Sequence, residues 1–209
     1  MNEYVYTEVL HDEMQAVISN LEAREWIQET MVEGDKVCAH GAVKTCEVLR
    51  PGDEQIIRAV MRRCGLTEEW NDEDGRTKSQ VLARMRQIEV SDADLANTFG
   101  PNWQMVIAVI RRVAILTLDE AQRMADAWTD ARYTTDARYT AWTAAWTAAR
   151  YATWTASRDA ARNTARDASV AVVVADLVGH HGLTQDHIDT LMKPWIEVLG
   201  EDWAEEVTP

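Results

Sequence analysis

Apolar residues recur at helical spacing through most of the first hundred positions. A recurrence every three to four residues is typical of helices that bury one face. The Gly34-Asp35 and Pro51-Gly52 steps interrupt the pattern and predict turns between helices. The pattern therefore predicts a helical module over residues 1–100, with helical segments at residues 8–29, 36–49, 54–64 and 78–88.

Two hydroxyl residues are placed to begin helices in the later part of this module. Thr77 precedes the segment 78–88, and Ser91 precedes a short apolar segment that ends near Gly100-Pro101. Their side chains can accept hydrogen bonds from the backbone amides of the first helical turn. Residues 68–75 lie between the predicted helix 54–64 and Thr77. They are mostly polar and are predicted to form a loop.

The second half begins with an apolar segment, Asn102–Leu116, at helical spacing. Thr117-Leu118-Asp119-Glu120 follows it and has the form of a capping box. In that motif the Thr117 hydroxyl accepts from the Glu120 amide, while the Glu120 carboxylate reaches back to the Thr117 amide. We therefore expect a new helix to begin at Leu118.

An unusual tract then extends toward the C-terminus. Between Met124 and Val170 there is no Leu, Ile, Val or Met, so apolar surface comes from alanine, threonine methyl groups, tryptophan and tyrosine. An unbroken helix over Leu118–Ala168 would be about 75 Å long, whereas a compact chain of this length is about 43 Å across. The tract must therefore either bend into a helical pair or project and pair with another subunit. The expected fold is all-α, with this long-helix module at residues 101–209 and short helices at its C-terminal end.

A helical wheel divides the tract into an aromatic face and an alanine face. Alanine lets helices approach closely, and tryptophan and tyrosine bury large areas while keeping a polar group. The aromatic face is the predicted binding surface for a protein partner or for a second copy of the chain. It comprises Trp128, Tyr139, Trp142, Trp146 and Trp154.

The formal net charge of −14 narrows the range of partners. Nucleic-acid binding is disfavoured, because phosphate contacts need a basic surface. The charge is compatible with a basic protein partner, or with a protein that mimics DNA. The sequence has no apolar run of about 18 residues that would predict a membrane span and no basic, apolar leader. The three cysteines cannot all pair within one chain. Their odd number, together with the lack of a leader, favours reduced thiols in a cytoplasm.

Cys38 is the candidate nucleophile, because a cysteine that opens a helix can have a lowered pKa. His40, two residues later, cannot face it on a helix, so a base would have to come from elsewhere, such as His180 or His181. Asn71 or Asp72 would orient that base. The alternative is structural: Cys38 would be a small buried residue.

The segment around Trp70 allows the same two interpretations. Asn71 and Asp72 could orient a substrate or hold a cation, or they could form turns and caps while Trp70 anchors the loop in the core. Cys-x-x-Cys pairs and His residues four apart are absent, and so are glycine-rich phosphate loops. We therefore expect neither a metal nor a cofactor.

Three stretches resemble a family of small uncharacterised proteins from actinobacteria and their phages, a domain of unknown function. They are Trp26-Ile-Gln, Val37-Cys-Ala-His-Gly-Ala-Val and Trp70-Asn-Asp-Glu-Asp-Gly-Arg-Thr-Lys-Ser-Gln-Val-Leu, and the resemblance covers residues 10–88. The stretch from Asp176 to Trp195, with the Ala/Trp repeats before it, resembles the C-terminal part of other such proteins. The resemblance implies an origin rather than an activity.

The sequence thus favours a non-enzymatic helical protein that binds a protein partner or itself. If it is encoded by a phage, it would act in the host cytoplasm. Two alternatives stay open: a cysteine-dependent enzyme that uses Cys38, and an acidic mimic of DNA.

Overall fold

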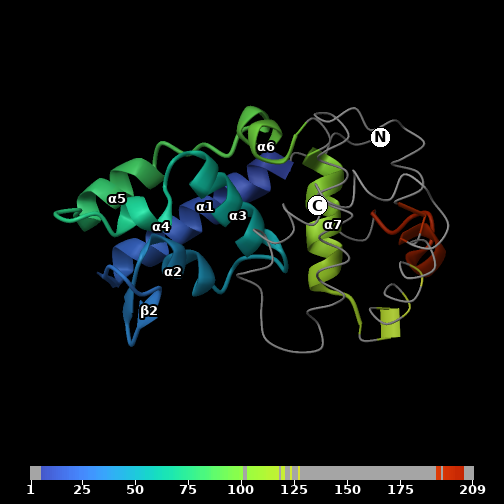
Figure 1. Cartoon of the computed structure of the whole chain (residues 1–209), viewed down its shortest axis with the longest axis horizontal. Coiled ribbons are helices and arrows are strands. Elements are labelled where there is room, and N and C mark those ends of the chain that lie inside the picture. Colours follow the sequence, from blue (N-terminus) through green and yellow to red (C-terminus); the bar gives the residue numbers. More distant parts are fainter. Residues whose placement is uncertain are drawn as a thin grey trace, which may run out of the picture. The chain divides into compact units, whose positions relative to one another are not determined.

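The structure is a computed structural model that describes residues 6–100, 103–117, 119–120, 123, 127, 192–193 and 195–204. The chain divides into two compact units, residues 1–98 with Pro209 and residues 99–208. The described residues are mostly helical (Figure 1). Among them, no helix is both long and apolar enough to cross a membrane.

The first unit is built around α1, which contacts α2, α3 and α5. The inward face of α1 carries Leu10, Met14 and Leu21, all fully buried. Ile56, Ile57 and Met61 of α3 are equally buried, as helical spacing requires of a helix with one core-facing side. The helices that include residues of this unit are α1 (Tyr6–Ala23), α2 (Ala39–Lys44), α3 (Asp53–Arg63), α4 (Glu68–Asn71), α5 (Lys78–Met85) and α6 (Asp92–Phe99).

Both helix starts predicted from hydroxyl residues in this unit are confirmed. Thr77 and Gln80 form a reciprocal capping box at α5, in which each side chain bonds the other residue's backbone amide. The Ser91 hydroxyl accepts from the Asp94 amide at 3.2 Å, and the Asp94 carboxylate accepts from the Ser91 amide at 3.0 Å. These bonds satisfy amides that have no partner within the helix.

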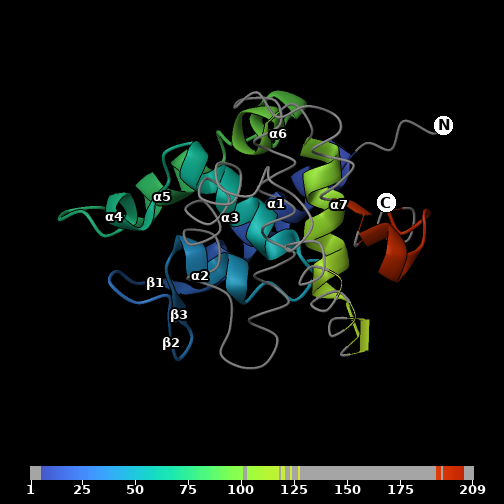
Figure 2. The same cartoon turned by 45° about the vertical axis from the view of Figure 1, so that its right-hand side comes forward.

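The expectation of an all-α fold is wrong in one region, where three two-residue strands form a small sheet. The strands are β1 (Glu25–Trp26), β2 (Val32–Glu33) and β3 (Lys36–Val37), in the order β1-β3-β2. β3 pairs parallel to β1 and antiparallel to β2. They lie together beside α2, to its left and lower left, in Figure 2. The helix predicted at residues 8–29 therefore ends at Ala23, and the segment 36–49 begins as a strand.

Strands this short leave no alternating pattern that a sequence could show. Trp26 lies at helical spacing from the apolar residues before it, which is why the sequence pattern predicts it as part of the first helix. In the structure the indole nitrogen of Trp26 instead donates to Asn71 Oδ1 at 3.3 Å. Gly34 has a φ of 60° and, with Asp35, forms the two-residue turn between β2 and β3, as tight hairpins require.

The sheet is joined to α2 by a close backbone approach at Gly41. The Met31 carbonyl accepts from the Cys38 amide at 3.0 Å. A Cβ atom on Gly41 would lie 1.8 Å from that same carbonyl oxygen. Only a residue without a side chain allows the segment before β2 to lie this close to α2.

The second unit begins with α7 (Trp103–Ala114). The capping box expected after it is confirmed, because the Glu120 amide donates to the Thr117 hydroxyl at 3.3 Å and Glu120 accepts from the Thr117 amide at 2.8 Å. Glu120 also bonds Arg112 of α7 at 2.7 Å. The bonds from Thr117 and the ion pair with Arg112 lower the pKa of Glu120 to about 2, although partial burial opposes them.

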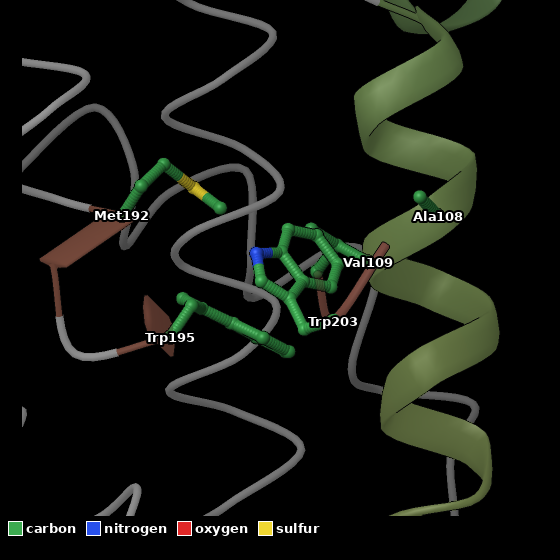
Figure 3. Packing of buried hydrophobic residues seen from close by; sticks show 5 residues of the cluster. All are labelled: Ala108, Val109, Met192, Trp195 and Trp203. Carbon is green, nitrogen blue, oxygen red and sulfur yellow. The ribbon is translucent and has the colours of Figure 1, made fainter. Parts of the chain in front are cut away.

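Two tryptophans from the C-terminal part help to form the apolar cluster of this unit. Trp195 and Trp203 have ring centroids 5.2 Å apart and planes tilted by 43°, an arrangement typical of favourable aromatic pairs. They cluster with Ala108, Val109 and Met192 (Figure 3). The predicted aromatic face of Trp128, Tyr139, Trp142, Trp146 and Trp154 lies outside the described residues.

We predict that Gly41→Ala destabilises the first unit by about 3 kcal/mol or more, because the added methyl group meets backbone that cannot move away easily. Urea unfolding followed by circular dichroism measures the loss. Gly75→Ala is the matched control: its Cβ would meet nothing within 4 Å, and only the positive φ of 79° opposes it. Equal losses in the two variants would show that the approach at Gly41 is unimportant.

Candidate functional site

Three of the four candidate catalytic residues, Cys38, Asn71 and Asp72, lie close together. Asn71 bonds the side chain of Asp72 and the backbone of the residue that follows Cys38. Cys38 immediately precedes α2, and Asn71 and Asp72 lie at the end of α4. Asn71 Oδ1 accepts from the Ala39 amide at 3.4 Å, and Asn71 Nδ2 donates to Asp72 Oδ1 at 2.7 Å. His40, on α2, bonds to a different segment. We call the set Cys38, His40, Asn71 and Asp72 the α2–α4 junction.

Cys38 serves as the N-cap of α2. Its Sγ accepts from the Gly41 amide at 3.3 Å, and the residue is 5% exposed. The expectation of a lowered pKa is wrong: burial raises the pKa of the thiol, and the amides of Gly41 and His40 offset this only in part. The nearby Asp72 carboxylate raises it further. The thiol is therefore protonated at neutral pH and is a weak nucleophile.

His40 is fully buried, with its Nε2 3.1 Å from the Leu66 carbonyl oxygen. This contact assigns the proton to Nε2 in the neutral ring. Burial lowers the pKa of His40 to about 4, although Glu68, whose carboxylate lies 3.8 Å away, opposes the shift. The ring is thus neutral at pH 7 and holds the segment after α3 against α2.

Asn71 is the polar centre of the junction and is 1% exposed. Its Oδ1 is shared by two donors, the indole nitrogen of Trp26 and the Ala39 amide. Its backbone carbonyl accepts from the Gln28 side chain at 3.0 Å. One amide side chain therefore joins α4 to β1 and to the start of α2.

Asp72 performs a similar task one residue later. Its Oδ1 accepts from the Glu29 amide at 3.0 Å. Glu29 has a φ of 67°, a conformation that most residues avoid, and the bond to Asp72 holds the turn in place. The segment predicted as a polar loop at residues 68–75 is in fact a short helix, α4, followed by a turn.

Sequence reasoning missed a cluster of charged groups beside His40. Arg62 makes a two-point ion pair with Glu68, and Arg58 lies 3.7 Å from the same carboxylate. Burial alone would raise the pKa of Glu68, but Arg62 and His40 outweigh it and lower the pKa to about 2. The spacing of Glu54, Arg58 and Arg62 at i, i+4 was the available signal.

An open pocket lies away from the junction, between α2 and α3. Its volume is about 260 Å³, and its lining includes Val43, Lys44, Leu49 and Arg50 but none of the four candidate residues. Within the described part of the chain, no three His, Cys, Asp or Glu side chains gather in a way that could hold a metal ion. The three cysteines are all free thiols. His180 and His181, the bases considered for Cys38, lie outside the described residues.

Comparison with known proteins places the junction within a recognised but uncharacterised domain. Residues 8–89 match the model of a family of unknown function (DUF6197). No curated protein and no solved structure matches the chain. The match includes all four residues of the α2–α4 junction, and it identifies residues 8–89 as an uncharacterised domain.

We predict that acid destabilises the protein in part through His40. Because its pKa is about 4 in the folded state and about 6.5 when unfolded, the unfolded chain binds more protons between these values. Stability from this group is complete above pH 6.5 and falls as the pH drops toward 4. We expect a loss of about 2 kcal/mol between pH 7 and pH 5.

Urea unfolding at a series of pH values measures this loss, and His40→Gln is the comparison. The glutamine amide can still donate to the Leu66 carbonyl but does not titrate. We expect the variant to be less stable at pH 7 and to have a flatter pH dependence. An unchanged slope between pH 7 and pH 5 would contradict the assignment.

We predict that Asn71→Ala costs about 2–3 kcal/mol, because the buried Ala39 amide and the Trp26 indole both lose their acceptor. Asp72→Asn is the matched control, since its Oδ1 can still accept from Glu29. We expect the control to cost less than about 1 kcal/mol. Thermal and urea unfolding measure both, and similar losses would show that Asn71 is not the centre of the junction.

Proposed function

We propose that this chain is a non-enzymatic helical protein that binds a protein partner or a second copy of itself. We further propose that it is encoded by an actinobacterium or one of its phages and acts in the cytoplasm of the host. The observation that carries the proposal is that the candidate catalytic groups already support the fold. Cys38 caps α2, His40 bonds the Leu66 carbonyl, and Asn71 bonds two elements.

A cysteine-dependent enzyme would need a thiolate and a base within reach of it. Burial raises the pKa of Cys38, and the ring nitrogen that bears the proton in His40 is directed to a carbonyl. If either side chain took part in catalysis, it would have to give up the hydrogen bond by which it holds α2 in place. These contacts favour the binding protein over the enzyme.

An acidic mimic of DNA would need rows of unpaired carboxylates. Several carboxylates of the described region are instead neutralised by neighbouring cations. Glu22 pairs with Arg86, Glu68 with Arg62, and Glu120 with Arg112. Interspersed charge of this kind favours a surface adapted to solubility or to protein contacts.

The aromatic face of the Ala/Thr/Trp tract is the binding surface in this proposal. We expect Trp142→Ala with Trp146→Ala to reduce the association of the chain while the circular dichroism spectrum and unfolding midpoint change little. Sedimentation velocity gives the oligomeric mass. A pulldown from an actinobacterial lysate, with the wild type and the variant side by side, gives binding to other proteins.

The chain offers a control on the same tract. At 100° per residue, Tyr133 and Tyr151 fall about 180° from Trp142 on a helical wheel, so Tyr133→Ala with Tyr151→Ala removes aromatic area from the other face. The proposal expects this pair to leave association intact. It is contradicted if both pairs have the same effect, or if the tryptophan pair unfolds the chain.

Alkylation of the thiols tests the enzyme alternative directly. We expect iodoacetamide to modify Cys46 and Cys64, which are half-buried, well before Cys38, which is buried. Peptide mapping by mass spectrometry measures the three rates at pH 7. Rapid and selective modification of Cys38 would support an enzyme and contradict the structural role given to this residue.

A further inference from the structure

Met31 and Arg58 form a contact that the junction does not explain. Arg58 Nη2 lies 4.0 Å from the sulfur of Met31. Met31 is half-buried, whereas Arg58 is only 6% exposed. A thioether is a weak acceptor, so this buried guanidinium faces a group that satisfies it poorly.

Arg58 has more donors than its surroundings accept. Glu54 accepts from Nη1 at 3.3 Å, and Glu68 lies 3.7 Å from Nη2, beyond ordinary hydrogen-bond distance. Its Nε has no acceptor among the described residues. A buried guanidinium whose donors are incompletely hydrogen-bonded is stabilised by a stronger acceptor placed beside it.

The backbone of Met31 is held where it is by α2. Its carbonyl oxygen accepts from the Cys38 amide and lies against Gly41. The side chain can therefore change chemically while its attachment point stays fixed. An oxygen atom added to the sulfur on the side of Arg58 would fall within ordinary hydrogen-bond distance of Nη2.

We propose that Met31 is an oxidation site whose sulfoxide is held by Arg58. Hydrogen peroxide transfers one oxygen to the sulfur: the O–O bond breaks, an S–O bond forms, and the second oxygen leaves with both protons as water. The sulfur is oxidised by two electrons and the peroxide is reduced by two. The sulfoxide oxygen then accepts a charge-assisted hydrogen bond from Arg58. Thiol-dependent reductases return the sulfoxide to the thioether: two thiols are oxidised to a disulfide, and the oxygen leaves as water.

This position differs from the other methionines of the described region. Met14, Met61 and Met85 are fully buried, and Met192, 6% exposed, belongs to the apolar cluster of the second unit; a sulfoxide at any of these positions would disrupt packing. Met105 is 40% exposed. At Met31, in contrast, oxidation adds a bond between the segment before β2 and α3. The modification should tighten the first unit instead of loosening it.

The test treats the intact chain with hydrogen peroxide and follows each methionine by peptide mapping. We expect Met31 and Met105 to oxidise while Met14, Met61, Met85 and Met192 do not. Oxidation of Met31 should raise the thermal unfolding midpoint by about 3 °C. The same treatment of Met31→Leu, which retains every other methionine, should give no such rise.

Two further measurements keep the test decisive. Met105→Leu should respond to peroxide as the wild type does, which separates the exposed methionine from Met31. The ¹⁵N-edited NMR signals of the Arg58 guanidinium should shift on oxidation in the wild type and stay in place in Met31→Leu. The proposal is overturned if Met31 resists peroxide that oxidises Met105, if its oxidation lowers the midpoint, or if the Arg58 signals do not move.

Discussion

The contact between Gly41 and the Met31 carbonyl sets the geometry of the first unit. Since the Met31 backbone lies directly against Gly41 of α2, its carbonyl can accept from the Cys38 amide, and Cys38 is placed to cap the helix. On either side of Cys38, β3 pairs with β1 and the Ala39 amide donates to Asn71 Oδ1. A side chain at position 41 would push the Met31 carbonyl away from the Cys38 amide. That loss is costly, because buried backbone donors need partners within hydrogen-bond distance.

The elements that the sequence predicted are those whose signals are local. Amphipathic spacing identified α1, α3, α5 and α7, and hydroxyl residues marked the starts of α5 and α6 and the Thr117–Glu120 box. The sheet could not be predicted in this way. Its strands are two residues long, and their pairing depends on contacts with residues far along the chain, such as Trp26 with Asn71. Helical periodicity simply continued through residues that tertiary hydrogen bonds hold as strands.

The candidate site shows the same division. Residue type and spacing identified Cys38, His40, Asn71 and Asp72, and Cys38, Asn71 and Asp72 do lie close together. What the sequence could not supply was burial, which reverses the electrostatic argument at Cys38. A helix N-terminus favours a thiolate in water, yet desolvation outweighs it when the sulfur is nearly sealed from solvent. The charged cluster of Arg58, Arg62 and Glu68 was missed because nothing in the sequence places Glu68 beside α3.

The position of Asn71 in the chain has a consequence for how the protein is made. The Ala39 amide depends on a side chain that lies 32 residues further along, and the Trp26 indole on the same side chain 45 residues further along. A ribosome releases the N-terminal segments first. While the chain is being synthesised, the segments of β1 and of the start of α2 emerge before the Trp26 indole and the Ala39 amide have their acceptor. The junction closes only after Asn71 has emerged, so a nascent chain stopped before that residue would expose an incomplete first unit.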